Sequence, residues 1–161
     1  MTNFLVFTDL DGTLLDHHSY SCEEAMPAVR ALAEAGFPLI FNSSKTAAEI
    51  KQLRQEIGNV HPFIVENGSA VCMPPGYCDG KLSPGLCIEE AYESQSFGPG
   101  YQPLLAQLHA LRSKRGYRFR GFADLNNEDV AQLTGLGVEA AAMARQREAS
   151  EPLLWDDSEE A

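Results

Sequence analysis

The chain begins with an apolar segment that ends in two closely spaced aspartates. Residues 4–8 (Phe-Leu-Val-Phe-Thr) have the length and composition of a buried β-strand, and Asp9, Asp11 and Gly12 follow directly. Side chains alternate along a strand, so Asp9 and Asp11 point into one small volume at its carboxyl end. Ligands of parallel α/β sheets bind at that end. The segment therefore predicts an α/β fold with a ligand site at its first strand.

The two carboxylates also suggest a chemistry. Like charges held this close repel each other unless a cation or a shared proton compensates, so we expect a Mg²⁺ site that handles phosphate. Asp9 ends the strand and suits a nucleophile that forms an aspartyl-phosphate. Asp11 suits a general acid for the leaving oxygen and then a base for the attacking water. Gly12 permits a turn through positive φ, and the Thr13 hydroxyl can hold it.

Two other structures could carry this pattern. A calcium loop counted from Asp9 would need glycine and glutamate where the chain has Leu14 and Tyr20, which excludes it. The second is a turn between two strands with surface carboxylates, because Asp-Gly is a common turn pair. An exposed turn does not explain the fully apolar strand before it, so the catalytic interpretation is favoured.

The pattern up to residue 71 alternates short apolar runs with helical periodicity. Short connections between such elements predict a right-handed, doubly wound parallel sheet. The expected strands are 4–8, 38–42 and 62–66, and the expected helices are 22–35 and 46–57.

Composition changes after residue 71. Residues 73–103 are rich in proline and glycine, which indicates a domain entrance with a hairpin or a long loop. We expect a core over residues 1–72 and a second lobe over 73–161. The second lobe's expected helices are 104–115, 127–133 and 138–147, and its expected strands are 118–122 and 152–155.

The second and third strands are also followed by polar residues. Ser43, Ser44 and Lys45 end the second strand and precede a helix, where hydroxyls, backbone N–H groups and the ammonium can bind a phosphoryl group. The alternative is a helix N-cap, which serine and threonine also provide. Asn67 follows the third strand within Asn-Gly, a turn signal, and could also touch a substrate.

Basic residues gather in the second lobe. Residues 112–147 hold seven of the chain's twelve lysines and arginines against four acids, a local charge of +3 in a chain of −11. Arginine binds carboxylate and phosphate bidentately, so this excess predicts an anion-facing surface. Arg145 and Arg147 are the favoured binding residues, whereas Arg112, Lys114 and Arg115 suit solubilising charge at a helix end.

Bulk properties exclude several classes of protein. Hydrophobic content of 44% and charged content of 22% are ordinary for a globular domain. The net charge of −11 disfavours nucleic acid and anionic membrane as partners. No apolar run reaches membrane-spanning length and no secretory leader is visible, so we expect a cytoplasmic protein with reduced cysteines.

These motifs resemble the haloacid dehalogenase phosphohydrolases. Residues 9–13 match their first motif and Ser43 their second, while residues 43–46, 121–124 and 143–152 resemble the subgroup acting on mannosyl-3-phosphoglycerate. The resemblance implies a Rossmann-like core with an inserted α+β cap, both incomplete, and a Mg²⁺-dependent phosphatase for a phosphorylated sugar-glycerate. It implies Asp9 and Asp11 as metal ligands. The implied phosphate and substrate ligands are Gly12, Thr13, Ser43, Ser44, Lys45, Asn67, Arg145, Arg147 and Ser150.

Two further motifs of that family are not evident: a lysine that balances the first aspartate, and an acidic turn that completes the metal site. Asp156 and Asp157 imitate the acidic turn only superficially, so we expect the chain to stop inside the cap. A non-catalytic remnant or binding module therefore stays open, as does another sugar-phosphate phosphatase or a phosphomutase. We expect little activity from this chain alone, and self-association through an exposed sheet edge.

Overall fold

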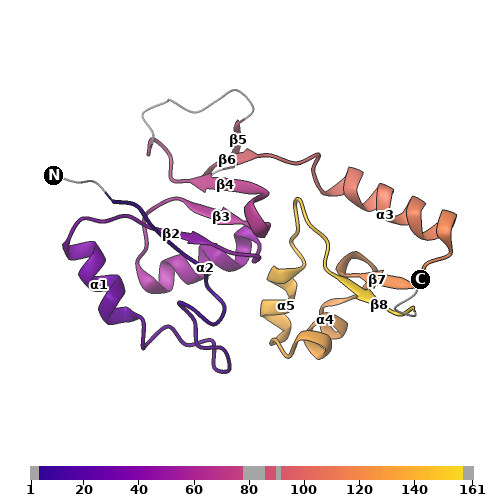
Figure 1. Ribbon diagram of the computed structural model, residues 1–161, viewed down its shortest axis with the longest axis horizontal. Coiled ribbons are helices and arrows are strands. Elements are labelled where there is room, and N and C mark those ends of the chain that lie inside the picture. Colours follow the sequence, from indigo (N-terminus) through magenta and orange to yellow (C-terminus); the bar gives the residue numbers. More distant parts are fainter. Residues whose placement is uncertain (1–3, 78–85, 90–91, 158–161) are drawn as a thin grey trace. The chain divides into compact units, whose positions relative to one another are not determined.

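The computed structural model describes residues 4–77, 86–89 and 92–157, and of residues 86–89 only the backbone. The chain forms two compact units, Met1–Phe97 (unit 1) and Gly98–Ala161 (unit 2). Figure 1 shows the sheet with its two helices in unit 1, and three helices with a short strand pair in unit 2.

The first three strands of unit 1 confirm the predicted parallel sheet. β1 (Val6–Thr8) pairs with β2 (Leu39–Asn42), and β2 pairs with β3 (Phe63–Val65), all in parallel. The connections run through α1 (Met26–Glu34) and α2 (Ala47–Ile57). Because parallel strands end at the same edge, the residues that follow β1, β2 and β3 come together there.

The start of α2 is fixed by its own sequence. Thr46 accepts from the Glu49 N–H at 3.3 Å, and the Glu49 carboxylate accepts from the Thr46 N–H at 2.9 Å, which makes a capping box. Gly58, at φ 75°, ends the helix in the left-handed region. The helix therefore begins at a defined distance from the carboxyl end of β2.

The sheet continues beyond β3 with antiparallel strands. The turn η1 (Glu66–Gly68) leads into β4 (Ala70–Met73), and β6 (Tyr92–Ser96) and β5 (Leu86–Glu89) extend the order to β1-β2-β3-β4-β6-β5. The compact units therefore divide after Phe97, whereas the sequence analysis divided core from second lobe after residue 72. The units differ from that division because β6 pairs with β4.

The core of unit 1 lies between the sheet and its helices. Phe41 and Phe63 of the sheet, Ile50 of α2 and Leu10 of the loop after β1 are completely buried in one cluster. β1 itself differs from the expected buried strand: Leu5 is 61% and Phe7 57% exposed. The prediction of a buried strand was wrong because β1 lies at an edge of the sheet, with only β2 as its neighbour among the described residues.

Unit 2 is a smaller α+β unit. Helix α3 (Tyr101–Arg115) precedes β7 (Phe119–Gly121), which pairs antiparallel with β8 (Leu153–Trp155). Between these strands lie η2 (Phe122–Asp124), α4 (Asn127–Thr134) and α5 (Val138–Ala144). Leu125, Val130 and Ala141 form its buried cluster. Among the described residues of both units, no helix combines the length and hydropathy needed to cross a membrane.

Candidate active site

A polar cavity lies at the carboxyl edge of the parallel strands. It has a volume of about 450 Å³ and is lined by Asp9, Asp11, Asn42, Ser43, Ser44 and Asn67. These residues follow β1, end or follow β2, and follow β3, so three strand ends contribute to one cavity. The juxtaposition of the two aspartates with the two serines agrees with the prediction from the sequence.

The loop after β1 presents the aspartates. The Asp9 carboxylate accepts from the Leu10 N–H at 2.7 Å, and the Leu10 carbonyl accepts from the Thr13 and Leu15 N–H groups. Gly12 has φ 70°, a conformation that side chains rarely adopt, so glycine is required there. These backbone bonds, together with the buried Leu10, fix the loop between Asp9 and Asp11.

The serine segment is fixed by backbone contacts from both sides. The Ser43 N–H donates to the Ile64 carbonyl at 3.1 Å, and the Ser43 carbonyl accepts from the Asn67 N–H at 3.0 Å. Ser43 is only 3% exposed, and its hydroxyl accepts from the Lys45 N–H at 3.2 Å. Ser43 thereby joins the ends of β2 and β3 at the cavity.

Asn67 reaches the cavity because the turn after β3 is unusual. Glu66 and Asn67 have φ 47° and 59°, in the left-handed region, where asparagine is among the better tolerated residues. The sequence analysis weighed a structural turn against a substrate contact for Asn67. The structure shows the turn and also places Asn67 in the cavity lining.

Lys45 lies beside Asp11 but is not among the residues that line the cavity. Its ammonium is 2.9 Å from Asp11 Oδ1 and 3.9 Å from Glu49 Oε1, and 5.5 Å from the centre of the Tyr20 ring. The sequence analysis predicted that the Lys45 ammonium binds phosphate, and it did not identify Glu49 or Tyr20 as residues of the site. A capping box was the only available signal for Glu49.

Other site predictions fared differently. Gly12 and Thr13 line a neighbouring hollow of about 350 Å³ rather than the aspartate cavity, and the contacts recorded for Thr13 are made by its backbone. Their contact with phosphate stays a prediction. Asn42 was missed as a site residue, although its position at the carboxyl end of β2 is the signal that could have identified it.

The donors in the cavity suit a hard cation. Its lining supplies two carboxylates together with amide and hydroxyl oxygens, which are the ligand types that Mg²⁺ takes while keeping several waters. Among the described residues there is no cluster of three or more His, Cys, Asp or Glu side chains arranged for a metal. The set therefore suits Mg²⁺, and the assignment of Asp9 and Asp11 as its ligands stays a prediction.

In unit 2, the predicted binding arginines lie near one tyrosine. Arg145 donates to the Phe122 carbonyl at 3.3 Å, and Arg147 donates to the Ser150 hydroxyl at 3.3 Å. Burial first, and then a hydrogen bond to Glu151, raises the pKa of Tyr101, while the charges of Arg147 and Arg145 oppose that rise. Tyr101 and Glu151 were not identified from the sequence.

Three other arginines of unit 2 pair with carboxylates. Arg112 pairs with Asp124 at 2.9 Å, a contact that the sequence analysis did not predict. Arg118 and Arg120 pair with Asp157 and Asp156 across the β7–β8 strand pair. These two aspartates are therefore engaged with arginines, as expected if they are not the acidic turn of a metal site.

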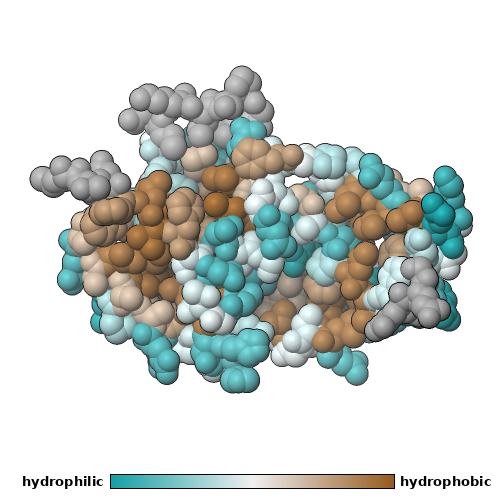
Figure 2. All heavy atoms as spheres, viewed as in Figure 1, coloured by the Kyte–Doolittle hydropathy of each residue, from teal (hydrophilic) through white to brown (hydrophobic). Residues whose placement is uncertain are grey.

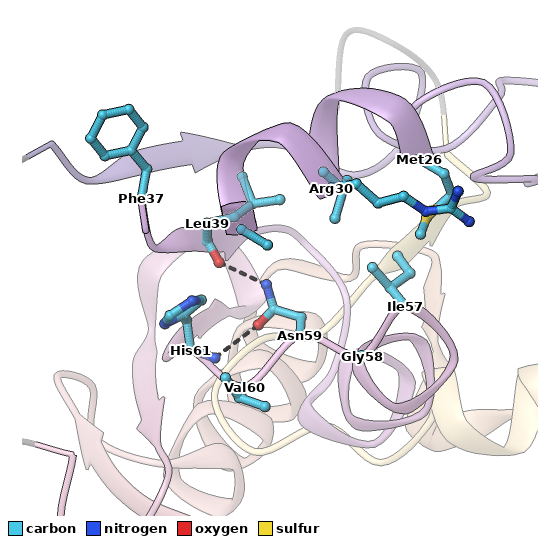
Figure 3. A pocket seen from close by; sticks show the side chains of 11 residues that line it. Met26, Arg30, Phe37, Leu39, Ile57, Gly58, Asn59, Val60 and His61 are labelled. Carbon is cyan, nitrogen blue, oxygen red and sulfur yellow. Dashed lines mark hydrogen bonds between the residues drawn. The ribbon is translucent and has the colours of Figure 1, made fainter. Parts of the chain in front are cut away.

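A second cavity of unit 1 lies at the opposite, amino end of β2 and β3. It has a volume of about 370 Å³ and is lined largely by apolar side chains of α1, α2 and the segments before β2 and β3 (Figure 3). Asn59 donates to the Leu39 carbonyl at 2.8 Å and accepts from the His61 N–H at 3.0 Å, which joins the two segments. No carboxylate is among its described lining residues, so the aspartate cavity is the better candidate for catalysis.

The fold and the cavity define a class: an α/β domain with paired carboxylates where its parallel strands end. Residues 6–78 match the family described as haloacid dehalogenase-like hydrolases. The segment that is similar to this family contains every residue of the aspartate cavity.

Two curated relatives are similar over nearly the whole chain. A protein of Methanococcoides burtonii is 40% identical and one of Persephonella marina is 34% identical, each over 157 residues. Both are named glucosyl-3-phosphoglycerate/mannosyl-3-phosphoglycerate phosphatase. The match covers 98% and 97% of this chain but 57% and 56% of those relatives, so the chain spans a little over half their length.

Solved structures show the same fold at low sequence identity. A haloacid dehalogenase subclass IIB sugar phosphatase is 17% identical with a TM-score of 0.52, over 88% of this chain and 55% of that protein. A member of a phosphoryl-transfer superfamily is 17% identical with a TM-score of 0.53, over 92% and 56%. These matches support the fold expected from the sequence.

Proposed function

We propose that this chain carries the nucleophile of a Mg²⁺-dependent phosphatase that acts on a phosphorylated sugar-glycerate such as mannosyl-3-phosphoglycerate. The observation that carries the proposal is the cavity in which Asp9 and Asp11 face Ser43 and Ser44 at the carboxyl edge of the sheet. The names of the two curated relatives support the choice of substrate class.

The proposed reaction has two steps. An Asp9 carboxylate oxygen attacks phosphorus, the bond from phosphorus to the ester oxygen of the glycerate breaks, and protonated Asp11 donates a proton to that oxygen. Asp11 then takes a proton from water as the water oxygen attacks the aspartyl-phosphate, which releases phosphate and restores Asp9. Bound Mg²⁺ would neutralise charge on the phosphoryl oxygens. The Ser43 and Ser44 hydroxyls supply hydrogen-bond donors for those oxygens.

Arg145, Arg147 and Ser150 are the proposed ligands for the carboxylate and sugar portion of the substrate. Arg145 donates to neutral acceptors, the Phe122 carbonyl and the Asn127 side chain, and so keeps its positive charge available. Arg112, by contrast, is neutralised by Asp124. In this proposal residues 73–161 form the cap, residues 1–72 belong to the core, and the protein is cytoplasmic.

The test is phosphate release under single-turnover conditions, with the chain in excess over substrate. The substrates are mannosyl-3-phosphoglycerate, glucosyl-3-phosphoglycerate and a simple hexose phosphate, each with and without Mg²⁺. We expect slow release, because Asp9 and Asp11 are the only carboxylates in the described lining of the cavity. Release should require Mg²⁺, vanish in Asp9→Asn and favour the glycosyl-phosphoglycerates.

Two other outcomes would support the alternatives. Faster, Asp9-dependent release from the hexose phosphate would identify another sugar-phosphate phosphatase of the same branch. Binding of a phosphoglycerate ester without any Asp9-dependent release would identify a non-catalytic binding module. Release that is unchanged in Asp9→Asn would refute the nucleophile.

A further inference from the structure

The ammonium of Lys45 is enclosed by acidic and aromatic side chains. It is 2.9 Å from Asp11 Oδ1, 3.9 Å from Glu49 Oε1 and 5.5 Å from the centre of the Tyr20 ring. The Lys45 side chain is only 17% exposed, whereas that of Asp11 is 38% exposed. An ion pair shielded in this way is stronger than one in open solvent, because fewer water molecules screen it.

Glu49 holds Lys45 from the side of the helix. One of its carboxylate oxygens, Oε2, accepts from the backbone N–H and the hydroxyl of Thr46, at 2.9 and 3.0 Å. The other oxygen, Oε1, faces the Lys45 ammonium. The Glu49 side chain is 11% exposed and Thr46 is completely buried. Glu49 therefore contacts Lys45 from a position that the capping box fixes.

The backbone of Lys45 is equally constrained. Its N–H donates to the Ser43 hydroxyl at 3.2 Å, and its carbonyl accepts from the Glu66 N–H at 3.0 Å. The residue is thus tied to the ends of β2 and β3 while its side chain spans to the loop after β1. Because these hydrogen bonds already fix the backbone of Lys45, less conformational entropy is lost when its side chain makes the ion pair.

The two aspartates consequently differ. The contact recorded for the Asp9 carboxylate is with the Leu10 N–H, a neutral donor, whereas the Asp11 carboxylate contacts a full positive charge. Both line the same cavity. Repulsion between them is reduced by neutralising one member of the pair, and the other keeps its charge for a cation or a phosphoryl group.

We propose that Lys45 is a positioning residue, the built-in counter-ion of Asp11, which directs divalent cations to Asp9. The part that concerns cations rests on the proposed function, whereas the Lys45–Asp11 coupling does not. In this account the lysine acts through the ionised Asp11 carboxylate, the form that takes a proton from water in the proposed second step, and it does not bind phosphate directly.

The first test is a double-mutant cycle on the whole chain, read by urea unfolding without metal. The variants are Lys45→Met, Asp11→Asn and the two combined. We expect the combined variant to lose less stability than the two single variants lose in sum. The difference should correspond to a factor of about threefold to tenfold in the unfolding constant. Lys45→Arg should restore most of the stability. Additive losses would overturn the proposal.

The second test measures Mg²⁺ affinity by NMR titration of backbone amides. We expect Lys45→Met to tighten Mg²⁺ binding by about threefold to tenfold, because Asp11 becomes available to the cation. That gain should disappear in the Asp11→Asn background. Lys51→Met removes the same charge from α2, the helix that follows Lys45. The Lys51 ammonium faces the Tyr92 ring, so its loss should change affinity little. An equal gain in Lys51→Met or in the Asp11→Asn background would overturn the proposal.

A third measurement covers the case in which Lys45→Met does not fold. A ¹⁵N-correlated NMR spectrum of the lysine ammonium groups should show a protected Lys45 signal in the unaltered chain and its loss in Asp11→Asn. A signal unaffected by Asp11→Asn would refute the ion pair. If no variant binds Mg²⁺, the proposed function fails, while the unfolding cycle still decides the role of Lys45.

Discussion

At the scale of single residues, Asp11 is the side chain whose replacement separates proton transfer from nucleophilic attack. Asp11→Asn keeps the shape of the side chain but removes its proton-transfer capacity, so we expect single-turnover phosphate release to fall by about 10²–10⁴-fold. Ser43→Ala should cost less, since it removes one hydroxyl from the cavity. The measurement is the phosphate release assay described above. A larger loss in Ser43→Ala than in Asp11→Asn would contradict these roles.

Asp124 makes unit 2 sensitive to acid. A hydrogen bond from Arg112, and then one from the Gly121 N–H, lowers the pKa of Asp124 below its ordinary value of 3.8. A carboxylate with a lowered folded pKa stabilises the fold above its unfolded pKa, and the contribution is lost as pH falls through the lower, folded value. Asp124→Asn should therefore cost about 1–3 kcal/mol near neutral pH, and the difference should shrink below pH 3.8.

The measurement for Asp124 is urea unfolding between roughly pH 2.5 and 7, a range that extends below and above the unfolded pKa of the carboxyl group. Asp156→Asn is the matched control, because Asp156 also pairs with an arginine but is more exposed. It should cost at most about 1 kcal/mol, the upper value typical of exposed ion pairs. Equal losses in the two variants would show that the contacts of Asp124 stabilise the fold no more than an exposed ion pair does.

The residue scale also shows what could be predicted from the sequence. Asp9, Asp11 and Ser43 were predictable because each follows an apolar strand, and parallel strands bring such positions to one edge. The partner of Lys45 was not predictable. The sequence is compatible with an ammonium that binds phosphate and with one that pairs with an aspartate on another loop. Three-dimensional distances, which no local pattern encodes, decide between them.

At the scale of elements, existence and type were easier to predict than ends or environments. α2 spans Ala47–Ile57, one residue shorter at its start than the predicted 46–57, because Thr46 caps the helix. α1 begins at Met26 rather than at residue 22, because residues 23–25 form a turn before the proline in its first positions. α5 ends at Ala144, earlier than the predicted residue 147. β1 is present, but Phe7 in it is exposed. An apolar run indicates that a strand can be buried, but it does not indicate where the strand lies in the sheet.

Gly121 at the end of β7 is required by a close contact in unit 2. A Cβ there would collide with the Glu151 carboxylate, which accepts from the Tyr101 hydroxyl at 2.6 Å and from the Ala123 N–H at 2.8 Å. Gly121→Ala should displace that carboxylate and cost about 1–3 kcal/mol in the free energy of unfolding. The Tyr101 pKa should also fall toward its ordinary value, because the bond to Glu151 helps to raise it.

Urea unfolding and ultraviolet titration of tyrosine check these two effects. Gly98→Ala is the matched control, since an added Cβ meets no atom within 4 Å there. It should change stability by less than about 1 kcal/mol, with the gain or loss set by the unfolded chain. If Gly121→Ala behaves like Gly98→Ala, the Glu151 contact does not constrain β7.

At the scale of the whole molecule, unit 1 has an apolar surface next to an open sheet edge. Phe4, Leu5 and Phe7 are 55%, 61% and 57% exposed, and hydrophobic side chains gather around the start of the chain in Figure 2. An exposed edge strand with apolar side chains is prone to pair with another chain. We expect concentration-dependent self-association of the chain in solution.

Leu5→Lys should reduce that association by placing a charge beside β1. Sedimentation velocity over a hundredfold range of concentration, roughly the span in which weak dimers dissociate, provides the measurement. Val60→Lys is the control, because Val60 is 68% exposed but belongs to the segment before β3, away from the β1 edge. A chain that stays monomeric throughout, or association that both variants reduce equally, would contradict a role for this edge.

The central claim is that Asp9 is a phosphoryl-accepting nucleophile, and beryllofluoride tests it most directly. This tetrahedral anion forms an aspartyl-phosphate mimic with a reactive aspartate, and ¹⁹F NMR detects the bound form without any turnover. With Mg²⁺ present, we predict a bound signal in the unaltered chain and in Asp11→Asn, and no bound signal in Asp9→Asn. A bound signal that persists in Asp9→Asn, or its absence from the unaltered chain, would contradict the assignment of Asp9.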